Sequence, residues 1–386
     1  MDEKIKKGSG NALTATLLFA AALIICWLAA NDFMKMWTDD VIVPVPEFKK
    51  GMLSDYLPKI KGTMLDTAVY IQDSGESGAT IFIMGGTHPN EPSGYFTAIL
   101  FLENVKVNQG RLIVMPFAMS SGFRHNSPQE ASPSFVTIPI PGGGNRVFRY
   151  GSRDMLHTLM WPTPDIYVHK PSGQELAGNE SKNLNRAYPG NPNGSPTEQV
   201  AFAIMELIRK ENVDLAFDLH EASPEYPVID AIVAHERSME LAAAATMELK
   251  GMDIEFRLEP SPPMLRGLSH REWGDGTETM PILMETGNPS QGRLRGRTDE
   301  ALVLTGKDKA YVKARDLGLL FIPFADGDQP IALRVARHVT ALRVFMETME
   351  FYFDDKAFSI EGIPDYEDIL KNGVGAYLKP VPGLTN

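Results

Sequence analysis

The hydrophobic residues of this chain form short runs that alternate with longer amphipathic stretches. Runs of about five apolar or β-branched residues bounded by turn residues predict strands, and apolar residues spaced three and four apart predict helices. The predicted strands are 66–72, 80–84, 111–117, 214–219, 228–234, 253–258 and 280–284, and the predicted helices are 92–104, 197–210, 237–249 and 331–353. Strands that alternate with helices indicate an α/β fold in which helices cover both faces of a sheet.

The longest apolar run lies near the N-terminus, from Ala12 to Ala30, and residues 8–31 carry no charge. A helix of this length can span the hydrocarbon core of a bilayer. Lysines before it and aspartates after it favour a cytoplasmic N-terminus and an extracytoplasmic body. We therefore expect residues 1–31 to be a membrane anchor. A signal peptide cleaved near Ala30, which would release a secreted or periplasmic protein, is the alternative.

The remaining chain reads as one domain with flanking segments. Residues 32–50 contain two prolines and are predicted to be a linker, residues 51–355 a single globular domain, and residues 356–386 a surface tail. Within the domain, residues 118–181 are rich in Gly, Pro and Ser. Such a long connection is usually functional or carries small elements of its own. Residues 288–327 are predicted to be irregular.

Composition narrows the chemistry. The chain has 386 residues, of which 43% are hydrophobic and 22% charged, which is typical of a globular protein. Its net charge of -12 argues against nucleic-acid binding, which needs Lys and Arg at the phosphates. Cys26 is the single cysteine, so any metal site must use carboxylates and some of the eight histidines.

Side chains that can bind metals follow the predicted strands. His88 and Glu91 come after a Gly-Gly turn at the end of strand 80–84, and His220 comes directly after strand 214–219. If these strands share a sheet, their carboxyl ends lie at one rim. Two histidines and one glutamate can bind Zn²⁺ and leave a coordination position open for water.

Two acids and an Asn-Arg pair complete the set. Glu285 follows strand 280–284 and suits a general base beside the metal, whereas Asp218 shares a strand face with His220 and is a candidate hydrogen-bond partner for it. Asn185 and Arg186 lie in a loop that ends in Pro and Gly. The planar guanidinium of Arg matches a carboxylate with two hydrogen bonds, which indicates an anionic substrate.

Four motifs occur in order: GGTHPNE (85–91), NLNRAYPG (183–190), DLHEAS (218–223) and METGNP (284–289). Together they resemble the zinc carboxypeptidase superfamily, most closely its succinylglutamate desuccinylase/aspartoacylase branch. The resemblance implies a three-layer fold with a mixed, twisted central sheet of about eight strands. It implies an amide hydrolase that acts on a small acylated amino acid or peptide. The implied roles are zinc ligand for His88, Glu91 and His220, general base for Glu285, and substrate-carboxylate binding for Asn185 and Arg186.

The chain also departs from that pattern. Pro89 stands where Gly is usual, and Asn183 stands where many relatives have an Asp that orients a zinc-bound histidine. The stretch between Glu91 and Asn185 is longer than in the small-molecule deacylases, so spacing does not identify the arginine that would stabilise an oxyanion. Its candidates are Arg146, Arg149 and Arg153.

The leading hypothesis is therefore a zinc-dependent deacylase, anchored to the membrane, for an N-acyl amino acid or a similar carboxylate-bearing substrate. A membrane-anchored zinc carboxypeptidase that trims cell-wall or other peptides is the alternative. A third possibility is a binding module that keeps the fold to recognise a carboxylate. Zn²⁺ is the expected ion, although two histidines and a glutamate also accept Co²⁺ or Ni²⁺.

Overall fold

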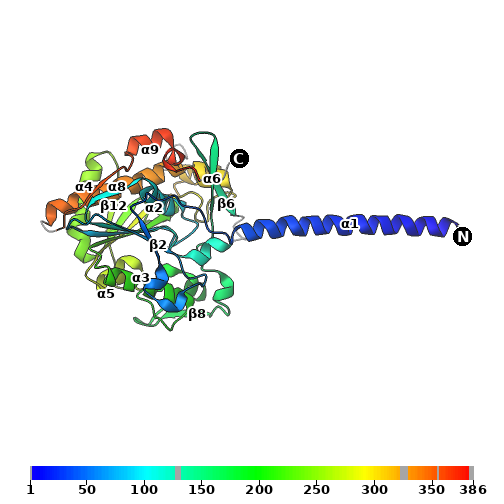
Figure 1. The fold of residues 1–386 in the computed structure, drawn as a ribbon, viewed down its shortest axis with the longest axis horizontal. Helices are drawn as coiled ribbons and strands as arrows, with labels where there is room; N and C mark the ends of the chain where they lie inside the picture. The colour runs from blue at the N-terminus through cyan, green and yellow to red at the C-terminus, as the bar shows by residue number, and fades with distance from the viewer. Residues whose placement is uncertain (1, 127–131, 322–328, 354–355, 382–386) are drawn as a thin grey trace. The chain divides into compact units, whose positions relative to one another are not determined.

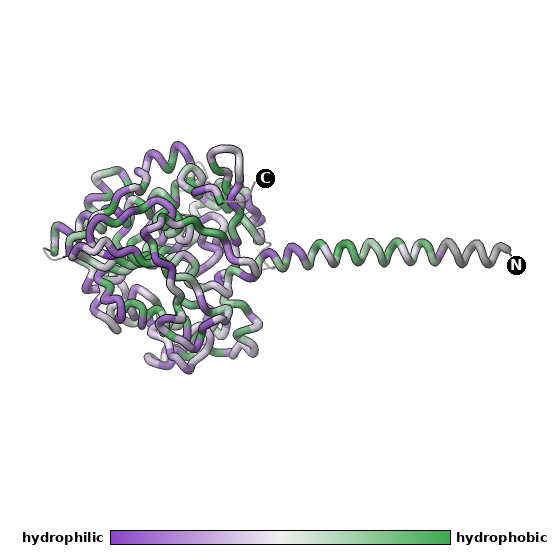
Figure 2. The backbone as a smooth tube through the Cα atoms, viewed as in Figure 1, coloured by the Kyte–Doolittle hydropathy of each residue, from purple (hydrophilic) through white to green (hydrophobic). Residues whose placement is uncertain are grey.

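A computed structural model of the protein describes residues 2–126, 132–321, 329–353 and 356–381. The chain forms two units, Met1–Asp40 and Val41–Asn386. The first unit contains helix α1 (Asp2–Lys35), whose segment Asn11–Lys35 is long and apolar enough to cross a membrane. Figure 2 shows the hydrophobic residues that follow one another along it. A signal sequence meets the same criteria, so anchoring and orientation stay predictions.

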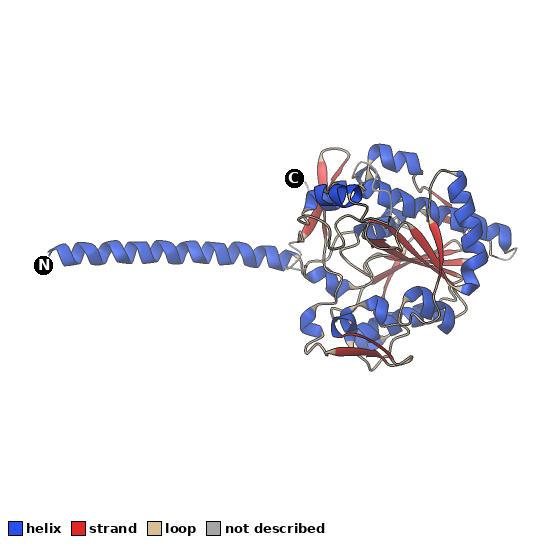
Figure 3. Cartoon of the chain, turned by 180° about the vertical axis from the view of Figure 1, so that it is seen from behind, coloured by secondary structure: helices blue, strands red, loops and turns tan. Residues whose placement is uncertain are grey.

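The second unit is built on a mixed sheet of eight strands in the order β1-β2-β5-β3-β10-β13-β11-β12 (Figures 1 and 3). The four central strands, β5, β3, β10 and β13, are parallel to one another. The sheet strands are β1 (Lys49–Met52), β2 (Ala68–Asp73), β3 (Thr80–Met84), β5 (Arg111–Met115), β10 (Leu215–Ala222), β11 (Ala231–Ala234), β12 (Arg257–Pro260) and β13 (Met280–Gly287). This architecture confirms the predicted three-layer α/β class.

Helices cover both faces of this sheet because its central strands are apolar on both sides. In β3, Ile81 and Ile83 pack into one core, and Phe82 and Met84 pack into the other. Figure 1 shows α2, α4 and α8 on one side and α3 and α5 on the other. These helices are α2 (Pro92–Asn104), α3 (Pro196–Lys210), α4 (Met239–Gly251), α5 (Ser269–Gly276) and α8 (Ile331–Tyr352).

The long connection of residues 118–181 carries small elements, as its length suggested. Two hairpins form there, β6 (Phe135–Ile140) with β7 (Gly144–Arg149), and β8 (Ile166–His169) with β9 (Gln174–Ala177). Its residues 127–131 lie outside the described part of the chain.

One prediction made outside the sheet was wrong, and the predicted tail carries secondary structure of its own. The stretch 288–327, predicted to be irregular, contains helices α6 (Glu300–Thr305) and α7 (Lys309–Asp316). The predicted surface tail, as far as it is described, forms β14 (Ser359–Glu361) and α9 (Tyr366–Asn372). β14 pairs with β4 (Lys106–Gln109), and Ile369 lies fully buried in the main core. The last five residues, 382–386, are not among those described.

A buried ion pair ties together both flanks of this unit. Glu103 and Arg146 lie 3.1 Å apart and are almost fully buried. Arg146 donates hydrogen bonds to the carbonyl oxygens of Val41 and Lys379, and Glu103 accepts from the backbone N–H groups of Val43 and Lys379. Residues 41–43, predicted as part of the linker, and Lys379 of the predicted tail are therefore attached to the globular body.

Candidate metal centre

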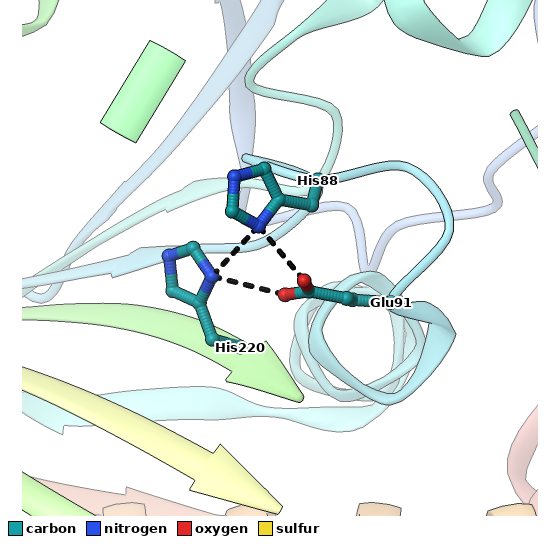
Figure 4. Close-up of side chains that lie close together, drawn as sticks. All are labelled: His88, Glu91 and His220. Carbon is teal, nitrogen blue, oxygen red and sulfur yellow. Dashed lines mark hydrogen bonds and ion pairs between the residues drawn. The ribbon is translucent and has the colours of Figure 1, made fainter. Parts of the chain in front are cut away.

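The turn after β3 presents His88 and Glu91 at the carboxyl end of the strand. Gly86 has a φ of +69°, a conformation that Gly adopts without strain, and the backbone then enters α2 at Pro92. His220 comes from the neighbouring strand β10, within the strand rather than after it. Figure 4 shows the three side chains turned toward one another.

The three side chains meet through a small set of atoms. Nδ1 of His88 lies 2.8 Å from one carboxylate oxygen of Glu91, and Nδ1 of His220 lies 2.9 Å from the other. The two Nδ1 atoms are 3.2 Å apart. Around a tetrahedral zinc with bonds of 2.0–2.1 Å, neighbouring ligand atoms are about 3.3 Å apart. The donor set and its spacing therefore fit a divalent ion.

The far side of His88 fixes its tautomer. Its Nε2 lies 2.8 Å from Oδ1 of Asn183, and this oxygen also accepts from the backbone N–H of Asn185. Since Oδ1 is thus an acceptor, Nε2 of His88 carries the proton and Nδ1 keeps its lone pair for the cluster. Burial lowers the pKa of His88, and the charge of Arg153 lowers it further, which favours this neutral form.

His220 is held from behind by Asp218. Its Nε2 lies 2.9 Å from the Asp218 carboxylate, which accepts hydrogen bonds from the hydroxyls of Thr87 and Ser269. Burial alone would lower the pKa of His220, but the carboxylates of Asp218 and Glu91 outweigh it and raise this pKa well above its ordinary value. The carboxylates therefore favour a positive charge at this point of the structure.

Glu285 stands beside the cluster on the next strand. In the parallel pair β10–β13 it lies in register with His220, so both side chains project from the same face of the sheet. Burial raises the pKa of Glu285 to about 8. Its Oε2 atom is buried and has no hydrogen-bond partner within the described part of the chain. A carboxyl group with a pKa in this range can exchange a proton with a neighbouring molecule near neutral pH.

Of the three arginine candidates, Arg153 reaches the cluster. Its Nη1 lies 3.1 Å from the Glu91 carboxylate and 3.2 Å from Nδ1 of His88. Arg146 instead forms the buried pair with Glu103. Arg149 is buried with its guanidinium 5.6 Å from the centre of the Phe123 ring.

Arg153 reaches the cluster because the long connection of residues 118–181 packs closely against the turn that carries His88. Gly151 has a φ of +75°, and a Cβ there would lie 2.4 Å from Cβ of Pro89. The backbone N–H of Ser152 donates to the carbonyl of Gly122. The Cα of Gly122 faces the ring of Pro89, with no room between them for a side chain. The unusual Pro89 is thus accommodated by glycines on the facing segments.

The predicted substrate-binding pair lies on the adjoining turn. Asn185 is buried, and its Oδ1 accepts from the backbone N–H of Ser269. Arg186 donates to the carbonyl of Asn185 and lies 3.5 Å from a carboxylate oxygen of Glu180. Burial, followed by the nearby charge of Arg153, lowers the pKa of Arg186. The guanidinium groups of Arg153 and Arg186 therefore lie near enough at the edge of the cluster for one charge to affect the other.

Sequence reasoning missed three residues that support this centre. Thr87 and Ser269 hold the Asp218 carboxylate, and Glu180 accepts from the side-chain amide of Asn183. Thr87 precedes a predicted ligand and Glu180 precedes Asn183 by three residues, so their positions offered a signal. Ser269 offered none, because only the fold brings α5 to β10.

No protein-family model and no curated protein sequence matches the chain. Solved structures do match it. A metallo-carboxypeptidase from Burkholderia cenocepacia is 10% identical at a TM-score of 0.45, over 84% of this chain and 69% of that one. The tripeptide-bound cell shape determinant Csd4 from Helicobacter pylori is 11% identical at 0.46, over 79% and 60%. A succinylglutamate desuccinylase from a Silicibacter species is 15% identical at 0.38, over 72% and 60%.

A desuccinylase and a carboxypeptidase are thus among the solved structures to which the chain is similar in fold. The chain spans 60% to 69% of the lengths of these three structures. The TM-scores of all three are below 0.5.

Proposed function

We propose that this protein is a zinc-dependent hydrolase that cleaves the amide bond of an N-acyl amino acid or a similar carboxylate-bearing substrate. One observation carries the proposal. Nδ1 of His88 and Nδ1 of His220 lie 3.2 Å apart, and each lies within 2.9 Å of a carboxylate oxygen of Glu91. Glu285 is in register with His220 on the neighbouring strand. A binding module would have no need of a glutamate at the position of Glu285.

The chain's own groups would divide the work. Zn²⁺ held by His88, Glu91 and His220 would supply Lewis acidity, which polarises a carbonyl and makes water a better nucleophile at neutral pH. Glu285 accepts the proton of the attacking water and returns it to the leaving amine. Burial raises the pKa of this carboxyl group above its ordinary value, which favours its use as a proton carrier near neutral pH.

Two arginines position the substrate. Arg153 places its guanidinium at the cluster, where it can donate hydrogen bonds to the oxygen that becomes negative in the tetrahedral intermediate. Arg186, on the next turn, binds the substrate carboxylate, for which a planar guanidinium offers two parallel donors. Asn185 is held in place by the N–H of Ser269 and contributes to the same subsite.

Metal analysis combined with Glu285→Gln tests the proposal. We expect the purified full-length protein to contain a divalent metal, and the variant to keep it while kcat toward N-acyl amino acids falls by about 10²–10⁴-fold. Glu278→Gln, at a glutamate whose side chain is 97% exposed, serves as the matched control and is expected to leave kcat unchanged. A protein without bound metal, or a Glu285→Gln variant as active as the wild type, would refute this function.

A substrate panel separates the deacylase from a carboxypeptidase of cell-wall or other peptides. The hairpin β8–β9 lies next to the substrate subsite, because the hydroxyl of Tyr167 donates to the carbonyl of Arg186. The assay compares the rates at which the protein cleaves muropeptides and N-acyl amino acids at equal concentration. Cleavage of muropeptides alone would assign the carboxypeptidase activity instead.

A further inference from the structure

Three side chains spaced three residues apart line up beside the metal centre. Glu180 lies in the 3₁₀ helix Gly178–Lys182, and Arg186 ends the next one, Leu184–Arg186, with Asn183 between them. The N–H of Asn183 donates to the carbonyl of Glu180, and the N–H of Arg186 donates to the carbonyl of Asn183. Asn183 has an extended backbone and joins the two 3₁₀ helices, so the side-chain contacts, and not a shared helix face, bring the three residues together.

These side chains form a continuous chain of contacts that ends on a metal ligand. The side-chain amide of Asn183 donates through Nδ2 to a carboxylate oxygen of Glu180, at 2.9 Å. Its Oδ1 accepts from Nε2 of His88, at 2.8 Å. The same carboxylate oxygen of Glu180 lies 3.5 Å from Nε of Arg186. One carboxylate therefore contacts both the partner of a ligand and the candidate substrate arginine.

We propose that Glu180 is a positioning residue whose negative charge acts on His88 through the amide of Asn183. This inference rests on the proposed function, because it concerns the strength of the metal site. A histidine that binds a metal usually donates its other N–H to a carboxylate, a carbonyl or water, which orients the ring and raises its basicity. Here the direct partner is a neutral amide, and the carboxylate stands one hydrogen bond behind it.

The relay has a physical basis in the polarity of the amide. A carboxylate at the donor end of an amide polarises it and makes its oxygen a stronger acceptor, since hydrogen bonds in a chain strengthen one another at low dielectric. Asn183 is only 2% exposed, so its amide lies in such a medium. The stronger acceptor holds the Nε2 proton of His88 and increases the electron density at Nδ1, the atom that faces the metal.

The arrangement makes a prediction that an ordinary surface ion pair does not. Asn183→Asp would restore a direct carboxylate for His88, but it would place that carboxylate against Glu180, where the present contact is 2.9 Å. Two carboxylates at hydrogen-bond distance cannot both remain ionised. Asn183→Asp should therefore lower the metal affinity while Glu180 is present. Adding Glu180→Gln should restore the affinity, because the glutamine amide can donate to the new carboxylate.

The test is a double-mutant cycle on metal affinity in the full-length protein. The probes are Zn²⁺, measured by competition with a chelator, and Co²⁺, followed by its visible absorption. Loss of a direct partner of a ligating histidine costs about 10–100-fold in affinity. For the relayed charge we expect Glu180→Gln to raise the Kd about 3- to 10-fold. Asn183→Asp should raise it at least as much, and the double variant should return to within about threefold of the wild type.

A matched control separates the relay from a general loss of surface charge. Glu206 likewise pairs with an arginine, Arg209, and its side chain is 24% exposed, against 27% for Glu180. Glu206→Gln should leave both Kd values unchanged. Thermal unfolding of the metal-free variants reports folding, and if Asn183→Asp does not fold, Glu180→Gln alone decides.

The outcomes distinguish this inference from the proposed function. If the wild type binds Zn²⁺ but Glu180→Gln behaves like Glu206→Gln, the relay is wrong and the metal site stands. A double variant that binds no better than Asn183→Asp alone also overturns it. If the wild type binds neither ion, the proposed function fails and this inference fails with it.

Discussion

Replacing Arg334 by Met is expected to destabilise the globular unit by about 3–5 kcal/mol, because it leaves a buried carboxylate without its counter-charge. Arg334 and Glu221 are both fully buried and lie 2.6 Å apart. The remaining partners of Glu221 are the side-chain amide of Asn288, at 3.0 Å, and the N–H of Ser93, at 3.3 Å. These are neutral donors and cannot replace the guanidinium.

The expected loss is large enough to measure by urea unfolding of the full-length protein in a mild detergent. With an m-value of about 3 kcal/mol/M, it lowers the unfolding midpoint by roughly 1–1.7 M. Lys106→Met is the matched control. Lys106 pairs with Glu361 at 3.0 Å, but both side chains are more than half exposed. Exposed pairs contribute about 0–1 kcal/mol, so this midpoint should move by less than about 0.3 M.

The double variant Glu221→Gln/Arg334→Met tests the cause. If the cost comes from the unpaired charge, removing that charge should recover at least about half of the lost stability. Equal midpoints for the single and double variants would mean that lost packing of the Arg334 side chain is responsible, which would refute the electrostatic reasoning. A shift no larger than that of Lys106→Met would refute it as well.

Two further predictions concern the active site and pH. Arg153→Met should lower kcat by about 10²–10³-fold while the metal content stays the same, as expected for loss of one oxyanion donor; kinetics and metal analysis check this, and an unchanged kcat would exclude the role. Burial lowers the pKa of His270 to about 3. In the unfolded state His270 has an ordinary pKa, so the unfolded state takes up a proton at a higher pH than the folded state does. The free energy of unfolding should therefore fall as the pH drops below about 6.5, by up to about 1.4 kcal/mol per pH unit. His270→Gln should reduce the slope measured by unfolding between pH 6.5 and 4.5, and an identical slope would contradict the assignment.

The central elements could be predicted because their signals are local. Strand 80–84 is bounded by turn residues and was found with its observed limits, as was helix 92–104, which starts at Pro92. Helix α3 starts at Pro196, one residue before its predicted start, and a capping box between Ser195 and Glu198 marks that end. The convergence of His88, Glu91 and His220 could be predicted for the same reason, since parallel strands in one sheet bring their ends to the same rim.

Elements that depend on distant partners could not be predicted. β14 is three residues long and exists because β4 pairs with it, and no periodicity marks so short a strand. α6 and α7 did have a local signal, because Asp299 and Asp308 cap their first turns. The choice of Arg153 among three arginines depends on how Gly151 packs against Pro89, a contact between segments about sixty residues apart in sequence.

The buried pair Glu103–Arg146 has a consequence for biosynthesis. It fixes backbone groups of Val41 and Val43 as well as those of Lys379. A ribosome must therefore have polymerised at least 379 residues before the pair can make all its contacts, and until then two buried charges lack part of their hydrogen bonding. Nascent chains arrested before that point should be more susceptible to proteases than the completed protein, even though every proposed zinc ligand has already been translated.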